Sequence, residues 1–218
     1  MSWHAIQDSI QFCEWCREAE SRIFAPFVSA WPTIPEPLKG AILFVSEAPP
    51  REGGFWSIQS STAKQDDLRN KILPLLKISS GGRDRGLTAF RNQKYFLLQS
   101  FPRPLIFPIG NLKTEELHTL LKHPVETHLE KQISYFSPSA ILALGKAGTA
   151  SMALLFNNSP FAIAYSRGGF NAVQGVTFED KSFPLMSATY LPSGNGRFWQ
   201  ERWAAHIPAF LQRAALYQ

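Results

Sequence analysis

Three short apolar runs limit the folds open to this chain more than any other feature of its sequence. They are Ala41–Val45, Tyr95–Gln99 and Ala140–Leu144. Successive positions are apolar, as in parallel strands that helices cover on both faces, whereas a strand with one face in water alternates. Stretches with helical spacing separate the runs, so the pattern predicts strands that alternate with helices.

This alternation predicts a three-layer α/β/α sandwich around a central, mostly parallel four-stranded sheet, whose ligands bind at the carboxyl ends of the strands. A further strand is expected over 185–190 and an edge strand over 173–178. Helices are expected over 3–23, over 198–216 and from Thr114 onward, with a break near Pro124. With 218 residues, 44% of them hydrophobic, the chain can close one core, and we expect a single domain.

The charge balance favours a polyanionic partner. Lys and Arg number 22 against 17 Asp and Glu, a formal net charge of +5, although many soluble proteins share such an excess. No apolar run approaches the roughly 18 residues of a membrane span. Residues 1–10 lack the basic-then-apolar order of a signal peptide. We therefore expect a soluble, cytoplasmic, monomeric protein with no membrane partner.

The only cysteines are Cys13 and Cys16, so no disulfide framework can stabilise the fold. Their spacing also occurs in metal and redox motifs, but a metal site needs two further ligands and the chain has no second Cys-x-x-Cys. One interpretation is two thiols on a mostly buried helix. The other is a mixed site that His123 joins. We expect no cofactor.

Several segments next to the predicted strands carry unusual residues. Glu47-Ala48-Pro49 follows the first strand, Gln99 ends the second and continues to Arg103-Pro104, and Leu144-Gly145-Lys146-Ala147 follows the third. The segment 191–197 follows the last strand and contains Pro-Ser. These segments, in this order, resemble the uracil-DNA glycosylase superfamily, and most of all its iron–sulfur type (family four). The 129–147 segment is the most specific, being similar to the family's Leu-x-x-Gln-Ile and Leu-Gly-x-x-Ala pattern.

The chain departs from that family pattern at several positions. Ser46 and Pro50 replace glycines, and Leu191 stands where most members have histidine. Cys13 and Cys16 match the first half of the iron–sulfur ligand set. The other half would fall near Pro102 and near His123, where there is no cysteine, so a four-cysteine cluster cannot form.

The resemblance implies catalysis by Glu47, whose carboxylate would orient water and offset the charge of an oxocarbenium-like sugar, with help from Ser193 and Asn195. A flipped base needs a ring to stack on and an amide that reads its edge. The implied base-binding residues are Ala48, Pro49, Phe55, Trp56 and Gln99. The implied DNA-binding residues are Leu191, Pro192, Gly194, Arg197 and Lys146. Arg51, Arg103 and Arg167 are further candidates for phosphate contacts.

Each of these roles has a simpler alternative. Glu47 fits a capping or ion-pairing acid, Phe55 and Trp56 fit ordinary core packing, and each basic residue fits a solvated surface charge.

Three function classes follow. The first is a DNA glycosylase acting on uracil or another deaminated base. We expect it to be slow, because loss of the donor that Leu191 replaces costs about 2–4 kcal/mol of transition-state stabilisation. The second is a catalytically impaired relative that binds DNA or a protein. The third is an unrelated small-molecule hydrolase or nucleotide-binding enzyme, but the chain lacks a phosphate loop, a nucleophile elbow and a dinucleotide fingerprint.

Overall fold

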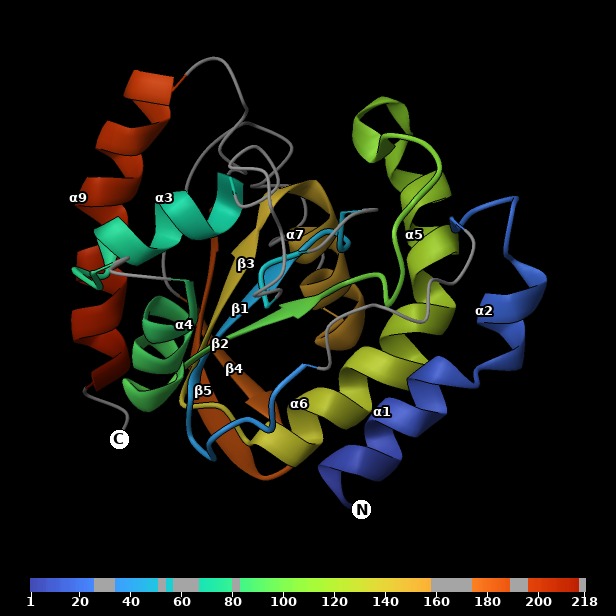
Figure 1. Cartoon of the computed structure of the whole chain (residues 1–218), viewed down its shortest axis with the longest axis horizontal. Coiled ribbons are helices and arrows are strands. Elements are labelled where there is room, and N and C mark those ends of the chain that lie inside the picture. Colours follow the sequence, from blue (N-terminus) through green and yellow to red (C-terminus); the bar gives the residue numbers. More distant parts are fainter. Residues whose placement is uncertain are drawn as a thin grey trace.

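Five strands form one sheet in the order β2-β1-β3-β5-β4 (Figure 1). The structure is a computed structural model, and it describes residues 1–25, 34–50, 54–56, 67–79, 83–157, 174–188 and 196–215. The strands are β1 (Ile42–Ser46), β2 (Tyr95–Gln99), β3 (Ala140–Leu144), β4 (Gln174–Phe178) and β5 (Lys181–Ala188). All neighbours are parallel except β4 and β5. Every residue of β1 and β3 is buried, which confirms the α/β prediction from continuous apolar runs.

The predicted count of four strands is wrong. β5 begins at Lys181 rather than at 185 and pairs antiparallel with β4 through the turn at Glu179 and Asp180. Glu179 has a φ of 53°, in the left-handed region that Gly or Asn usually occupies in such turns. Because the sequence has neither residue there, the usual hairpin signal is missing.

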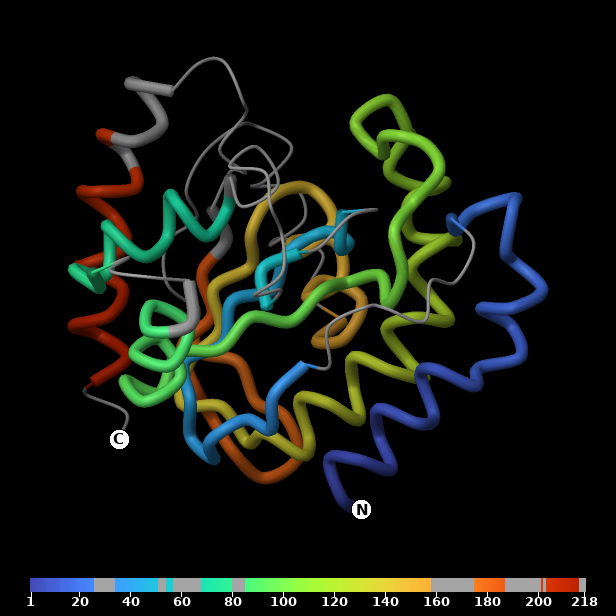
Figure 2. The backbone as a smooth tube through the Cα atoms, viewed as in Figure 1, coloured from blue at the N-terminus to red at the C-terminus, as the bar shows by residue number. Residues whose placement is uncertain are grey.

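Helices cover both faces of the sheet (Figure 1). One layer holds α3 (Asp67–Leu75), α4 (Arg83–Asn92) and α9 (Gly196–Ala215). The other holds α1 (Trp3–Gln11), α5 (Thr114–Pro124), α6 (Glu130–Phe136) and α7 (Gly145–Leu155). A short 3₁₀ turn, η2 (Ile109–Asn111), precedes α5. Figure 2 shows the first 20 residues running beside residues 114–136, so segments distant in sequence pack together.

The predicted helix over 3–23 is broken into two. After α1, Phe12 is 71% exposed, and Cys13 caps a second helix, α2 (Glu14–Glu18). The Cys16 backbone N–H donates to the Cys13 sulfur at 3.4 Å. The break therefore brings both cysteines to one end of α2.

The helical segment after α5 is also irregular. At Pro124 the α-helix gives way to one π-helical turn, η3 (Val125–Leu129), before α6 begins. The Glu130 N–H donates to the Val125 carbonyl, an i→i+5 bond. Such single π turns are rare and often occur at functional sites.

Helix α7 lies very close to β1. Gly145 starts the helix with a φ of 71°, a conformation that glycine adopts without steric cost. A Cβ atom at Gly148 would lie 2.3 Å from the Val45 carbonyl oxygen. The backbones can approach this closely only because position 148 has no side chain.

Candidate functional site

The carboxyl ends of β1, β2 and β3 lie at one edge of the sheet, and we call Glu47, Gln99 and Gly145 there the strand-end site. Gln99 is opposite Ser46 in the register, and Glu47 follows directly. The Phe101 N–H donates to the Glu47 carbonyl oxygen at 2.9 Å. From β1 the chain continues outward to β2, whereas from β3 it continues in the opposite direction, to β4 and β5. Open α/β sheets bind ligands where the direction reverses in this way.

Glu47 has the electrostatics of a candidate general base. Its side chain is half-buried, and burial raises the pKa of the carboxyl above its ordinary value, because loss of hydration disfavours the charged form. None of the ion pairs between described residues involves Glu47. An acid with a raised pKa at a ligand-binding edge is suited to accept a proton from water.

Three other predicted base-binding residues line the same edge. Gln99, Ala48 and Pro49 are half-buried. Their exposed parts make them available to a ligand, while the backbone bond from Phe101 holds the loop that carries them.

Phe55 and Trp56 lie in the core. They are 6% and 9% exposed. The Trp56 indole N–H donates to the Leu97 carbonyl at 3.0 Å, and its ring lies 4.6 Å from that of Phe96, centroid to centroid. The Phe55 ring packs on Phe90 at 5.1 Å. Core packing accounts for both rings, and their stacking on a base stays a prediction.

The expected DNA-contacting loop lies outside the described residues, as do Arg51 and Arg167. β5 ends at Ala188, opposite Leu144, so the described chain stops at the same edge as Glu47. Arg197 lies in the first turn of α9, but its side chain is not described. The loop residues concerned are Leu191, Pro192, Ser193, Gly194 and Asn195.

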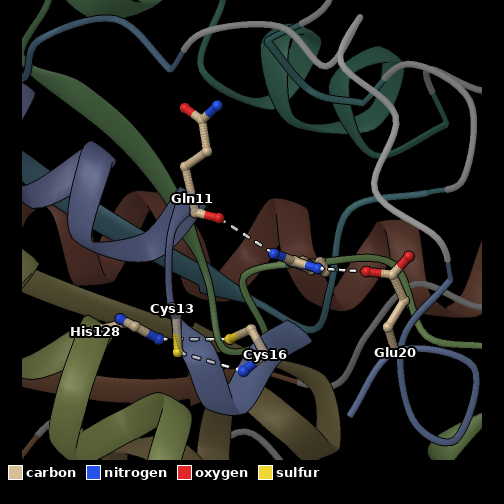
Figure 3. A network of polar contacts seen from close by, with 6 residues as sticks. Gln11, Cys13, Cys16, Glu20 and His128 are labelled. Carbon is tan, nitrogen blue, oxygen red and sulfur yellow. Dashed lines mark hydrogen bonds and ion pairs between the residues drawn. The ribbon is translucent and has the colours of Figure 1, made fainter. Parts of the chain in front are cut away.

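Two basic residues proposed for DNA contact have partners within the protein. The Lys146 ammonium, at the start of α7, donates to the Leu112 carbonyl. Arg103 is 3% exposed and donates to Glu20 at 3.1 Å and to the Gln11 carbonyl at 3.2 Å (Figure 3). The buried Arg103 is therefore unavailable to a phosphate.

Cys13, Cys16, His123 and His128 form a second group, the Cys–His cluster. The Cys16 sulfur lies 3.6 Å from His128 Nε2, and the Cys13 sulfur lies 3.5 Å from His123 Nε2. Ligand atoms of Cys13, Cys16 and His128 all lie within 4.8 Å of one another. Figure 3 shows the His128 ring pointing at Cys16, with Cys13 beside it.

The π turn puts the two histidines on the same side of their helix. In an α-helix of 3.6 residues per turn, residues five apart face different directions. The wider turn at η3 corrects this for His123 and His128, whose ring centroids are 5.6 Å apart. Thr127 Oγ1 lies 3.5 Å from His123 Nδ1, and Trp15 stacks on the same ring at 4.5 Å.

Burial favours the uncharged forms of Cys16 and His128. It lowers the pKa of His128 to about 4, and His123, Lys131 and Arg103 contribute to this shift. Burial and the neighbouring Cys13 raise the pKa of Cys16. The His128 Nδ1 atom is buried without a hydrogen-bond partner among the described residues. A neutral imidazole is the form that binds metals, whereas a thiol must first lose its proton.

Sequence reasoning considered His123 but missed His128. The signal that could have found it was the spacing His-x₄-His, which together with Cys-x-x-Cys is a known pattern of zinc ligands. The unusually long separation of the two pairs, which lie at 13–16 and 123–128, conceals this pattern.

No model of a known protein family matches this chain, and no curated protein is significantly similar to it. Among the described helices, none has the length and apolarity needed to cross a membrane.

Proposed function

We propose that this protein is a DNA glycosylase that hydrolyses the N-glycosidic bond of uracil or another deaminated base after base flipping. The observation that carries the proposal is the position of Glu47, a half-buried acid without an ion-pair partner among the described residues, where the strand connections reverse. The neighbouring Gln99 adds a terminal amide, which can both donate to and accept from a pyrimidine edge.

In the proposed reaction, water attacks the anomeric carbon while the bond to the base nitrogen breaks. The base leaves with the bonding electron pair and then takes a proton from solvent. The Glu47 carboxylate orients the water, offsets the positive charge on the sugar and accepts the water's proton. Its raised pKa makes it a stronger base than an ordinary carboxylate. The products are an abasic sugar and the free base.

One observation favours a second candidate, a relative that binds DNA without cleaving it. Phe55 and Trp56 pack against Phe90 and Phe96, so their ring faces already contact protein. A flipped base would then lack the aromatic platform that cleavage requires.

Single-stranded and duplex oligonucleotides containing uracil, hypoxanthine or xanthine test the proposal. Abasic sites are detected by alkaline strand cleavage. We expect product with the wild-type protein and with Glu115→Gln, which changes an exposed acid on α5, but not with Glu47→Gln. Salt-sensitive binding without product supports the second candidate. Product that is undiminished in Glu47→Gln contradicts the mechanism.

A further inference from the structure

Two sulfur–nitrogen distances in the Cys–His cluster match those in the coordination shell of one tetrahedral ion. Zinc binds sulfur at about 2.3 Å and imidazole nitrogen at about 2.0–2.1 Å, so a tetrahedral site has sulfur–nitrogen separations of about 3.6 Å. The two observed separations are 3.5 and 3.6 Å. We propose that Cys13, Cys16, His123 and His128 bind a single zinc ion.

The donor set points to the same ion. Two sulfurs and two nitrogens in tetrahedral arrangement are typical of zinc or an iron–sulfur centre. Two thiolates and two neutral imidazoles balance the charge of Zn²⁺, leaving a neutral centre. Such neutrality suits a site where Cys16 is fully buried and His128 is 3% exposed, because burying net charge is costly.

Iron–sulfur clusters fit these residues poorly. The four-cysteine cluster that the family resemblance implies needs four thiolates, and the chain has two. A two-iron centre with two cysteines and two histidines puts the thiolates on one iron and the imidazoles on the other. Here each cysteine sulfur is next to an imidazole nitrogen instead, which indicates one shared ion.

The surroundings hold the ligands in place. The Cys16 N–H bond to the Cys13 sulfur stabilises a thiolate. Thr127 and the stacked Trp15 orient the His123 ring, as outer residues commonly do at metal sites. His123 is half-buried and its Nε2 atom lies beside the Cys13 sulfur, but it is outside the group of three residues whose ligand atoms lie within 4.8 Å of one another, so its ring would have to move toward the other ligands on binding.

Four protein ligands would leave no open coordination position, so the zinc is structural rather than catalytic. It joins α2 to the π turn η3, across more than 100 residues of sequence. Closing so long a loop restricts the unfolded chain strongly. The ion therefore fastens the N-terminal helices to the rest of the fold.

Metal analysis and X-ray absorption of the full-length wild-type protein test this inference without any variant. We expect one zinc per chain, with a first shell of two sulfurs and two nitrogens. Iron with acid-labile sulfide would overturn the proposal in favour of a cluster. Protein that contains no zinc and takes up none from added Zn²⁺ would also overturn it.

Variants then assign the ligands. Cys16→Ser and His128→Asn should lose zinc, whereas His4→Asn, which changes an 87% exposed histidine on α1, should keep it. If a folded His128→Asn protein retains the wild-type zinc shell, the assignment of that ligand is wrong. Should a variant fail to fold, the X-ray absorption spectrum of the wild-type protein still shows whether two sulfurs and two nitrogens bind the zinc. Glycosylase activity is not the readout, so failure here leaves the proposed function standing.

Discussion

The strand-end site and the Cys–His cluster are built in opposite ways. Glu47 and Gln99 are half-buried residues at the ends of strands, where a ligand can reach them. The cluster buries Cys16 and His128 among helices. Glu47 has no ion-pair partner among the described residues, whereas each cysteine sulfur faces a histidine. The contrast teaches that side chains of one region are accessible from solvent, while those of the other face one another inside the protein.

A series of contacts nevertheless connects the two regions. Trp15 stacks on His123, and its ring centroid lies 5.8 Å from that of Phe24. Phe24 contacts Phe101 at 6.3 Å, and the Phe101 N–H bonds to the Glu47 carbonyl. Proximity alone does not establish energetic coupling. Variants that affect one region should therefore be tested for effects on the other.

The largest effect is expected at Glu47. Glu47→Gln should lower the single-turnover rate of base release by about 10²–10⁴-fold, the usual contribution of a general base. The melting temperature and zinc content should stay at least at wild-type values, since the acid has no ion-pair partner in the described structure. A large loss of stability would break the comparison, because it would make Glu47 a structural residue.

Cys16→Ser should have the opposite effects: a large loss of stability and little change in the rate of base release. Loss of a bound metal is among the most destabilising changes a substitution can cause. If the free energy of unfolding falls by about 4 kcal/mol, the melting temperature of a chain of this length falls by roughly 10 °C. Well below that temperature, base release by the folded variant should remain within about threefold of wild type if coupling is weak. Calorimetry measures the melting temperature, and single-turnover assays measure the rate of base release. If the folded Cys16→Ser protein released the base a hundredfold more slowly than wild type, the aromatic contacts would couple the two regions.

A smaller effect is expected at Gln99. Gln99→Leu removes the amide and should slow release of uracil by about tenfold or more, since a good bidentate base contact is worth about 1–3 kcal/mol. Binding to a product duplex with an abasic site should not change. Gln93→Leu, at an exposed position between α4 and β2, is the control. Equal rates of base release in the two variants would show that the Gln99 amide does not contact the base.

The smallest effect concerns pH and stability. Because burial raises the pKa of Glu47 in the folded state, folding favours the protonated form. The charged form therefore costs stability, and that cost appears as pH rises from the unfolded pKa through the folded one. Glu47→Gln should match the wild type at acidic pH and be slightly more stable at neutral pH. Denaturant titrations at several pH values check this, and a constant difference across pH contradicts it.

The sequence predicts the strands of the sheet centre well, because short continuous apolar runs between helical segments are typical of buried parallel strands. It also places Glu47 and Gln99 at one edge, since parallel strands end on the same side of a sheet. The break after α1 is harder to predict, because Phe12 and Cys13 are both apolar and only the folded chain shows Phe12 exposed. The edge strand over 173–178 is predicted, but its hairpin with β5 escapes prediction because Glu179 and Asp180 form a turn without its usual residues.

The Cys–His cluster shows why part of a site can escape sequence reasoning. On a regular helix, His123 and His128 would point in different directions, so the His-x₄-His spacing alone does not show that both rings reach one ion. The π turn that aligns them depends on how Pro124 and the residues after it pack. Only the tertiary structure then brings both histidines to cysteines more than 100 residues away.

The missing side chain at Gly148 has a consequence for the spacing between α7 and β1. Since the Val45 carbonyl occupies the space of a methyl group there, alanine would push the first turn of α7 outward from β1. Backbone contact thus sets where the start of α7 lies relative to the end of β1. A substitution at position 148 would therefore displace Gly145 from Glu47 without changing either residue.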